Sequence, residues 1–243
     1  MKIIGVIPAR YASARFPGKP LIDLKGKSMI QRVYEGAMKS SKLSRVIVAT
    51  DDNRIFDEVK RFGGEVIITS EEHLTGTDRC GEVASGLDVD IIVNIQGDEP
   101  LVDFRQLDQL CSAFEDETVQ IATLGIIGVS SEDMNNPNRI KIVLDKNKDA
   151  LYFSRSPIPN SQNGKHEAMK SFDFYRHIGL YAYRSDTLKK IVRLEPTALE
   201  KVESLEQLRW LYHGFKVRVM ETDIETPNID VPEDIQKVMS KLL

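Results

Sequence analysis

In the first half of the chain, continuous apolar runs alternate with segments in which apolar residues have the spacing of a helix. Short apolar runs cover residues 3–7, 46–49, 66–68 and 91–95, and each is followed by polar sequence. Between these runs, the segments 29–40, 54–62 and 78–86 have the spacing of helices. Buried strands that alternate with helices are typical of a parallel sheet with helices on both faces. We therefore predict a three-layer α/β fold with a mostly parallel sheet.

The pattern becomes less regular after Gly125. Strands are predicted at 139–144, 150–153 and 177–183, a polar loop at 157–171, a helix at 199–213, a strand at 216–220 and a final helix at 232–243. We interpret residues 1–243 as a single domain, with a smaller α/β lobe over roughly residues 128–190 built into it.

Composition excludes several classes of protein. The net charge is -4, which does not favour binding to nucleic acid or to a membrane surface. No apolar run is long enough to cross a membrane, and the N-terminus shows no signal peptide. The two cysteines, Cys80 and Cys111, lack the spacing of zinc sites or disulfide frameworks. These features favour a cytoplasmic protein.

A loop of small residues and cations follows the first predicted strand. Within residues 8–20 it carries Arg10, Arg15 and Lys19, together with proline and glycine. Three cations on one wrapped loop can point toward a single anion, and a departing pyrophosphate needs that density of positive charge. The alternative is a solvated basic loop, but Arg10 lies directly after a strand, where functional residues concentrate.

Two other phosphate motifs are excluded. Gly26-Lys27-Ser28 resembles the end of a P-loop, but Leu21 stands where the first glycine belongs. No glycine triplet with dinucleotide-binding spacing follows a predicted strand, which argues against a nicotinamide or flavin enzyme. The sequence thus predicts phosphate binding by side chains.

An acidic residue follows the fourth strand. Asp98 comes after Gln96 and Gly97, at the strand end that should share one crevice with the 8–20 loop. A carboxylate in this place suits Mg²⁺, although a turn aspartate would look the same. Asp230 lies three residues before Glu233, and helix capping explains it equally well.

Many short motifs, in order along the chain, carry a resemblance to a known family. They are Ile7-Pro8-Ala9-Arg10-Tyr11-Ala12-Ser13 with Arg15, Pro17-Gly18-Lys19-Pro20-Leu21, Val48-Ala49-Thr50-Asp51, Gly76-Thr77-Asp78-Arg79, Gln96-Gly97-Asp98-Glu99-Pro100, Leu151-Tyr152-Phe153-Ser154-Arg155, Arg176-His177-Ile178-Gly179-Leu180-Tyr181, Leu205-Glu206-Gln207-Leu208-Arg209 and Asp230 with Pro232-Glu233-Asp234. Over nearly its whole length the chain resembles the CMP-Kdo synthetases, cytidylyltransferases with a nucleotide-diphospho-sugar transferase-like fold that activate 3-deoxy-manno-octulosonate (Kdo) for lipopolysaccharide synthesis.

The resemblance implies a role for each matching residue. The nucleotide would be held by Pro8, Ala9, Arg10, Ser13, Arg15, Lys19, Gly76 and Thr77, with Arg10, Arg15, Lys19 and Asp98 as catalytic residues. The sugar would be held by Gln96, Arg155, His177, Tyr181, Glu206 and Gln207. The resemblance also implies that Asp98 and Asp230 hold Mg²⁺, that CTP and Kdo are the substrates, and that the protein is a homodimer formed through the smaller lobe.

The residues themselves are consistent with the sugar-side roles. Alternation along a strand puts His177, Gly179 and Tyr181 on one face, and helical spacing would put Glu203, Glu206 and Gln207 on one helix face. A half-buried strand and a solvated helix face would show the same patterns. Arg155 could pair with the sugar carboxylate or with a protein acid.

The expected reaction is attack of the anomeric 2-hydroxyl on the α-phosphorus of CTP, without a covalent enzyme intermediate or a dedicated general base. Alternative acceptors are 8-amino-Kdo or a sialic-acid type nonulosonate. The segment Pro227-Asn228-Ile229-Asp230-Val231-Pro232 departs from the Gly-Val-Asp-Thr-Pro common in the family, which leaves the exact sugar open. A non-catalytic nucleotide-binding module or a glycosyltransferase would share the sheet, and sugar-dependent pyrophosphate release separates both from the enzyme.

Overall fold

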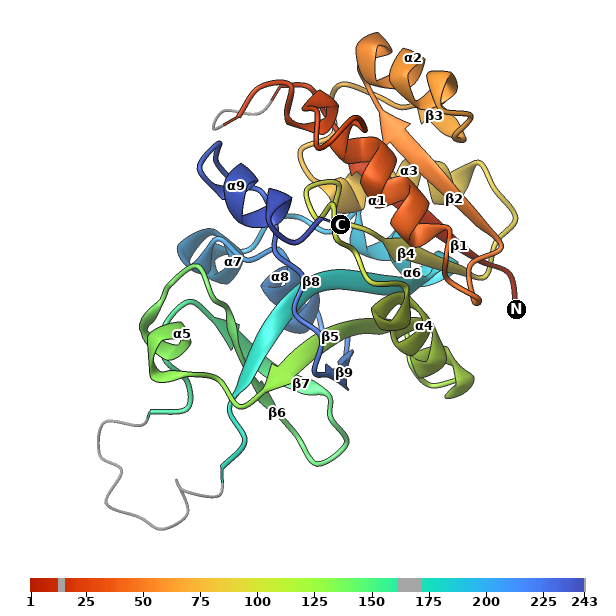
Figure 1. The fold of residues 1–243 in the computed structure, drawn as a ribbon. Coiled ribbons are helices and arrows are strands. Elements are labelled where there is room, and N and C mark those ends of the chain that lie inside the picture. The colour runs from red at the N-terminus through yellow and green to blue at the C-terminus, as the bar shows by residue number, and fades with distance from the viewer. Residues whose placement is uncertain (13–15, 161–171, 243) are drawn as a thin grey trace. The chain divides into compact units, whose positions relative to one another are not determined.

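The computed structural model describes residues 1–12, 16–160 and 172–242. The strands are β1 (Ile3–Ala9), β2 (Arg45–Thr50), β3 (Val66–Ile68), β4 (Ile91–Asn94), β5 (Ile121–Ile127), β6 (Lys141–Leu144), β7 (Ala150–Ser154), β8 (Tyr175–Arg184) and β9 (Val217–Thr222). The α-helices are α1 (Met29–Ala37), α2 (Asn53–Arg61), α3 (Gly76–Ser85), α4 (Phe104–Ser112), α5 (Ser131–Asn135), α6 (Ser185–Ile191), α7 (Ala198–Glu203), α8 (Gln207–Tyr212) and α9 (Asp234–Met239) (Figure 1).

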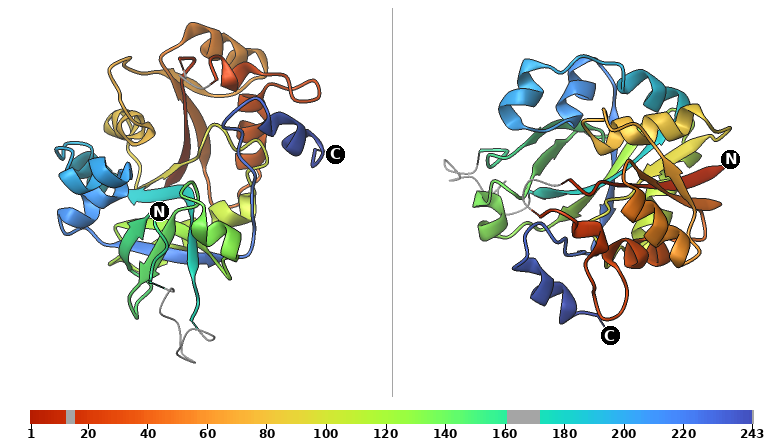
Figure 2. Two further views of the ribbon diagram at one scale, coloured as in Figure 1. Left: turned by 90° about the vertical axis from the view of Figure 1, so that its left-hand side faces the viewer. Right: turned by 90° about the horizontal axis from the view of Figure 1, so that it is seen from above.

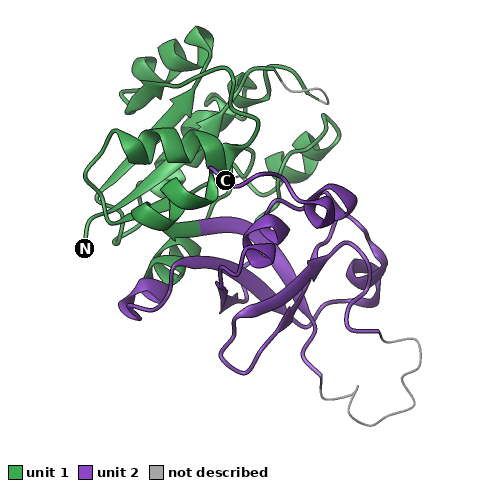
Figure 3. Cartoon of the chain, turned by 180° about the vertical axis from the view of Figure 1, so that it is seen from behind, with its two compact units in different colours: residues 1–111, 182–192, 225–243 green, residues 112–181, 193–224 purple. Residues whose placement is uncertain are grey.

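The chain divides into two compact units. The first comprises residues 1–111, 182–192 and 225–243, and the second comprises residues 112–181 and 193–224 (Figure 3). The strand β8 contributes residues to both. Among the described residues, none of the helices is both long and apolar enough to traverse a bilayer.

The first unit contains the parallel sheet predicted from the sequence. Its strands lie in the order β3-β2-β1-β4, and each neighbouring pair is parallel. All but one of the residues of β1 and all four of β4 are buried, which explains why both strands are continuous apolar runs. Helices α1 and α2 cover one face of this sheet and α3 covers the other (Figure 2). The three-layer arrangement is therefore confirmed.

The order of the strands indicates where a binding crevice should lie. The chain passes outward from β1 to β2 and β3 and then returns to put β4 on the other side of β1. The connections leave in opposite directions at the carboxyl ends of β1 and β4, and open α/β sheets bind their ligands at such a switch point. Arg10 follows β1 directly, and Gln96 to Asp98 follow β4.

The second unit is built on shorter pairings. Its β5 pairs with β9 in parallel, while β6 pairs with both β7 and β8 in antiparallel fashion. Helix α8 packs against α7 and β7. Parts of this unit, β5 and the helix α5, were not predicted from the sequence.

One predicted helix is wrong in the second unit. The segment 199–213 forms two short helices, because Ser204 adopts left-handed backbone angles, with φ of 52°, and ends α7. A residue in that conformation stops the helical hydrogen-bond ladder. As a consequence, Glu203 belongs to α7, Glu206 precedes α8 and Gln207 begins it, so the three side chains do not share one helix face.

Candidate active site

A cavity of about 250 Å³ opens at the carboxyl ends of β1 and β4. Its lining residues are Pro8, Ala9, Arg10, Lys19, Pro20, His73, Leu74, Thr75, Gly76, Arg79, Gln96, Gly97 and Asp98. The expectation that the segments after residues 7 and 95 share one crevice is confirmed. Ser13 and Arg15 lie outside the described residues, and Thr77 is buried in the first turn of α3.

Two glycines let three chain segments meet at the cavity. A Cβ on Gly97 would lie 2.8 Å from the Pro8 carbonyl oxygen, and a Cβ on Gly76 would lie 3.2 Å from the Pro8 ring. Backbone atoms cannot yield at the first of these contacts, so only glycine fits there. The cavity therefore has peptide groups in its wall as well as charged side chains.

Lys19 and Asp98 are held together at the cavity. The Lys19 ammonium donates to Asp98 Oδ2 at 2.9 Å and to the Ile229 carbonyl at 2.8 Å. Both side chains are partly buried, at 14% and 27% exposed. An ammonium has three N–H bonds. These two contacts leave one of them for a third acceptor such as a phosphate oxygen.

Asp230 is not among the residues that line the cavity, but its chain segment contacts Asp98. Ile229 donates its backbone N–H to the Asp98 carbonyl at 2.9 Å, so residues 229 and 230 run beside Asp98. The capping explanation for Asp230 is wrong, because α9 begins at Asp234 with Glu233 at its N-cap. The Asp234 carboxylate instead accepts from the backbone N–H of Asp230 at 2.9 Å. Packing of Ile229 into an apolar cluster with Leu24 and Met29 fixes this segment.

The loop that carries the cations is anchored by Tyr11. The Arg54 guanidinium, from α2, lies 3.3 Å from the centre of the Tyr11 ring. On the chain itself, Gly18 donates its N–H to the Tyr11 carbonyl at 2.9 Å and has a φ of +74°. A Cβ at Gly18 would lie 3.1 Å from the Tyr11 side chain. Tyr11 thus ties Gly18, next to Lys19, to helix α2.

Glu99, next to Asp98, was not singled out from the sequence. Its side chain is buried, and Thr226 donates a hydrogen bond to Oε2 at 3.1 Å. Desolvation, together with the negative charge of Asp98, raises the pKa of Glu99 to about 8. Glu99 is therefore mainly neutral at pH 7, which spares the pocket a second full negative charge beside Asp98.

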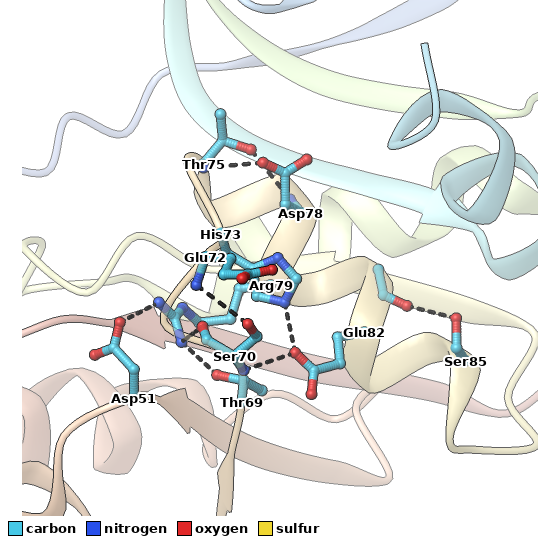
Figure 4. A network of polar contacts seen from close by, with 11 residues as sticks. Asp51, Thr69, Ser70, Glu72, His73, Thr75, Asp78, Arg79, Glu82 and Ser85 are labelled. Carbon is cyan, nitrogen blue, oxygen red and sulfur yellow. Dashed lines mark hydrogen bonds and ion pairs between the residues drawn. The ribbon is translucent and has the colours of Figure 1, made fainter. Parts of the chain in front are cut away.

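A polar network supports the segment that leads into α3 (Figure 4). The buried Arg79 binds Asp51 Oδ2 at 2.6 Å and also contacts Thr69 and the Ser70 carbonyl. Glu82 accepts from the Ser70 backbone N–H at 2.9 Å and pairs with His73. The capping box of Thr75 and Asp78 starts the helix. The network holds His73 to Gly76 at the cavity, and its acidic members were not predicted.

In the second unit, His177 and Tyr181 lie in a row of rings. The His177 ring is 5.3 Å from Phe153 and 5.2 Å from Tyr181, and Tyr181 is 5.1 Å from Trp210. The alternation that predicted a shared face for His177 and Tyr181 agrees with this contact. Burial lowers the pKa of His177 to about 3, so the imidazole is neutral in the working pH range.

Arg155 contacts backbone carbonyls. Its guanidinium donates to Glu203 O at 2.8 Å, Pro137 O at 3.0 Å and Ser204 O at 3.2 Å. Glu203 in turn accepts from the Arg155 backbone N–H at 3.0 Å and from Ser154 at 2.7 Å. These contacts use three of the five guanidinium N–H bonds, so within the described residues two remain to donate to another group. The left-handed turn at Ser204, which breaks the predicted helix, is what points its carbonyl at Arg155.

Comparisons with known proteins agree with this geometry. Residues 4–224 match the model of a cytidylyltransferase family. A 3-deoxy-manno-octulosonate cytidylyltransferase of Parabacteroides distasonis is 53% identical over 100% of this chain and 98% of its own length. The chain belongs to this cytidylyltransferase family. A further 3-deoxy-manno-octulosonate cytidylyltransferase, from Geobacter metallireducens, is 48% identical with the same coverage.

A solved structure extends the likeness to three dimensions. The CMP:2-keto-3-deoxy-manno-octonic acid synthetase in complex with CTP superposes with a TM-score of 0.93 at 41% identity, over 99% of this chain and 98% of that one. A glucose-1-phosphate thymidylyltransferase described as putative, from Bacillus anthracis, shares the fold at a TM-score of 0.68 and 15% identity, over 98% of this chain and 94% of that one. The fold is thus that of the nucleotidyltransferases, and the cytidylyltransferases are the more similar group.

Proposed function

We propose that this chain transfers CMP from CTP to the anomeric 2-hydroxyl of Kdo and releases pyrophosphate. The observation that carries the proposal is the cavity in which Arg10, Lys19 and Asp98 meet, in a chain 53% identical to a 3-deoxy-manno-octulosonate cytidylyltransferase. Cations at the switch point of a parallel sheet supply what a triphosphate needs.

The chain's cations act on the leaving group. Arg10 and Lys19 line the cavity, and Arg15 belongs to the same loop. Negative charge grows on the pyrophosphate as its bond to the α-phosphorus lengthens, so fixed cations stabilise the transition state more than the bound substrate. Because Asp98 and the Ile229 carbonyl already hold the ammonium of Lys19, little reorganisation is needed when CTP binds.

Asp98 and Asp230 are proposed to hold Mg²⁺. Carboxylate oxygens are the ligands this ion prefers. The hydrogen bond from the Ile229 backbone N–H to the Asp98 carbonyl brings the segment that carries Asp230 next to Asp98, which supports the proposal. Clusters of three or more acidic, histidine or cysteine ligands are not found in the described residues, which fits an ion that keeps water and phosphate ligands. When bound, the ion would neutralise charge at the α-phosphate and favour ionisation of the attacking hydroxyl.

The sugar is proposed to contact Gln96, Arg155, His177, Tyr181, Glu206 and Gln207. Arg155 keeps N–H bonds for a carboxylate, which is a feature of the acceptor. His177 serves to orient the sugar, because an imidazole with so low a pKa is a poor base at neutral pH. We propose that the attacking hydroxyl loses its proton to solvent and not to His177, with no dedicated protein base.

We also propose a homodimer that works in the cytoplasm, where CTP is made. The second unit exposes large apolar side chains at Leu151, Val202 and Tyr212, with 60%, 84% and 68% of their surface accessible. Covering such side chains with a second copy of the chain would remove apolar surface from water. Light scattering on the purified chain at micromolar concentration should give twice the monomer mass, and a monomer would contradict the dimer alone.

The reaction is tested by incubating the protein with CTP, Mg²⁺ and a panel of Kdo, 8-amino-Kdo and N-acetylneuraminate. Kdo should give the fastest pyrophosphate release, a CMP-sugar product by mass spectrometry, and no turnover with chelator. Faster turnover of another sugar acid would show that this sugar acid, and not Kdo, is the acceptor. If no member of the panel gives pyrophosphate, the proposed cytidylyltransferase activity is wrong.

A further inference from the structure

A buried hydroxyl in the second unit contacts His177. Thr123 lies in β5 and is 0% exposed. Its Oγ1 is 2.8 Å from the Leu180 carbonyl oxygen, 3.2 Å from the Ile178 carbonyl oxygen and 3.0 Å from Nε2 of His177. The Tyr181 side chain also interacts with the Thr123 hydroxyl. Two carbonyls and two side chains thus surround one hydroxyl, and the contact distances assign its roles of donor and acceptor.

A hydroxyl has a single proton and can accept through its lone pairs. The two carbonyls can only accept, and the shorter contact, to Leu180, takes the proton. Thr123 Oγ1 then offers a lone pair toward His177, so Nε2 must carry the hydrogen. In a neutral imidazole only one nitrogen is protonated, which leaves Nδ1 with a free lone pair.

The surroundings keep the ring in this state. Phe153 and Tyr181 pack against it at 5.3 and 5.2 Å, so rotation would disturb both ring contacts. Desolvation of the partly buried His177 lowers its pKa, which favours the neutral imidazole with one protonated nitrogen. Among the described residues, Thr123 is the hydrogen-bond partner that the His177 ring has. Nδ1 therefore remains available as an acceptor.

We propose that Thr123 is a positioning residue that fixes the tautomer of His177, so that the ring presents Nδ1 to the sugar as a hydrogen-bond acceptor. This inference rests on the proposed function, because the contact between His177 and the sugar is part of that proposal. An acceptor at this point selects a substrate with a hydroxyl or amino donor and disfavours one with a hydrogen or methoxy group there. Thr123 thus contributes to sugar selection without contact to the sugar.

The tautomer is tested directly by NMR. The full chain is labelled with ¹⁵N-histidine, and the signals of His177 among the four histidines are assigned by their loss in His177→Asn. At pH 7, Nε2 should be protonated and Nδ1 should show the shift of an unprotonated nitrogen. Thr123→Ser should keep this spectrum, whereas Thr123→Val should lose the single tautomer. A wild-type ring protonated at Nδ1 would overturn the proposal.

Kinetics test the role in sugar binding. Thr123→Val should raise KM for Kdo about tenfold, the scale of one lost buried hydrogen bond, and leave KM for CTP within about twofold. Thr123→Ser is the matched control and should behave as wild type. His177→Asn, whose amide oxygen can stand near the place of Nδ1, should retain more Kdo binding than His177→Gln.

Each outcome has a separate meaning. An unchanged KM for Kdo in folded Thr123→Val would overturn the positioning role, and so would equal rises for both substrates. If Thr123→Val does not fold, the wild-type spectrum still tests which nitrogen of His177 is protonated. The comparison of His177→Asn with His177→Gln still tests whether Nδ1 is the acceptor for the sugar. Failure of the wild type to use Kdo would defeat the proposed function, while the spectrum would still confirm or overturn the tautomer.

Discussion

The nucleotide pocket of the first unit and the ring cluster of the second unit use opposite physical means. In the pocket, cations and carboxylates lie on loops at strand ends, and the central pair of Lys19 and Asp98 remains partly exposed. In the cluster, His177 and Tyr181 project from a strand into packed aromatic rings. A triphosphate is recognised by charge, whereas sugar hydroxyls require neutral donors and acceptors in fixed positions.

The two regions also treat buried titratable groups in opposite ways. Burial raises the pKa of Glu99 to about 8 and lowers that of His177 to about 3, so both groups are neutral near pH 7. Beside the pocket, neutral Glu99 adds no second full negative charge next to Asp98. In the cluster, neutral His177 keeps one acceptor nitrogen. Desolvation thus produces neutrality in both places, from an acid in one and a base in the other.

The largest expected effect is from Asp98→Asn, which removes both a proposed metal ligand and the partner of Lys19. Turnover should fall about a thousandfold or more, because charge at the α-phosphate loses its compensation. The measurement is kcat for pyrophosphate release at saturating CTP and Kdo over a range of Mg²⁺ concentrations. The exposed Asp88→Asn is the matched control. If Asp98→Asn stays active with an unchanged Mg²⁺ requirement, Asp98 is not a ligand of the metal.

Lys19→Ala should lower kcat about a hundredfold, the effect of one fixed donor aimed at developing charge. Replacement of the exposed Lys39 by alanine controls for net charge. The proposed role requires the loss to lie in turnover with CTP. Near-normal turnover in Lys19→Ala would mean that Lys19 only ties Asp98 to Ile229.

Glu99→Gln should change the pH dependence of stability. The folded pKa of Glu99 lies above its unfolded value of 4.5, so its stabilisation is complete below about pH 4.5 and is lost as pH rises toward 8. Glutamine does not ionise and avoids that loss. Relative to wild type, the variant's free energy of unfolding in urea should rise by about 4 kcal/mol from pH 5 to pH 9. A difference that is the same at both pH values would show that Glu99 does not titrate there.

Arg54→Ala should have the smallest effect. Loss of the guanidinium over the Tyr11 ring loosens the loop that carries Lys19, and KM for CTP should rise about threefold while KM for Kdo stays constant. Arg54→Lys keeps a cation at the ring and should recover part of the loss. An effect on Kdo alone would contradict the assignment of this loop to the nucleotide.

The difference between the two regions explains which features the sequence predicted. Arg10 and Asp98 stand next to strand ends, and the strands themselves are continuous apolar runs, so local pattern located the pocket and the parallel sheet. The second unit, which extends beyond the predicted smaller lobe, carries fewer local signals of this kind. The predicted helix over 199–213 ignored Ser204, because a left-handed residue other than glycine gives little signal in sequence.

The residues that the sequence missed act over long sequence separation. Thr123 meets His177 only because β5 and β8 lie together. Asp51 acts through its contact with Arg79 of α3, and Glu82 through its contact with Ser70 in the segment before α3. Nothing local marks a buried threonine as the partner of a histidine. Glu99 stood beside the predicted Asp98, but its burial, which sets its protonation, depends on the segment near Thr226.

Steady-state kinetics with CTP and Kdo varied in turn measure the contrast most directly, for wild type, Lys19→Ala and Thr123→Val. If charge in one unit serves the nucleotide and neutral hydrogen bonding in the other serves the sugar, Lys19→Ala should impair turnover or KM for CTP and leave KM for Kdo within about twofold, and Thr123→Val should do the reverse. Equal impairment of both substrates by both variants would contradict the account.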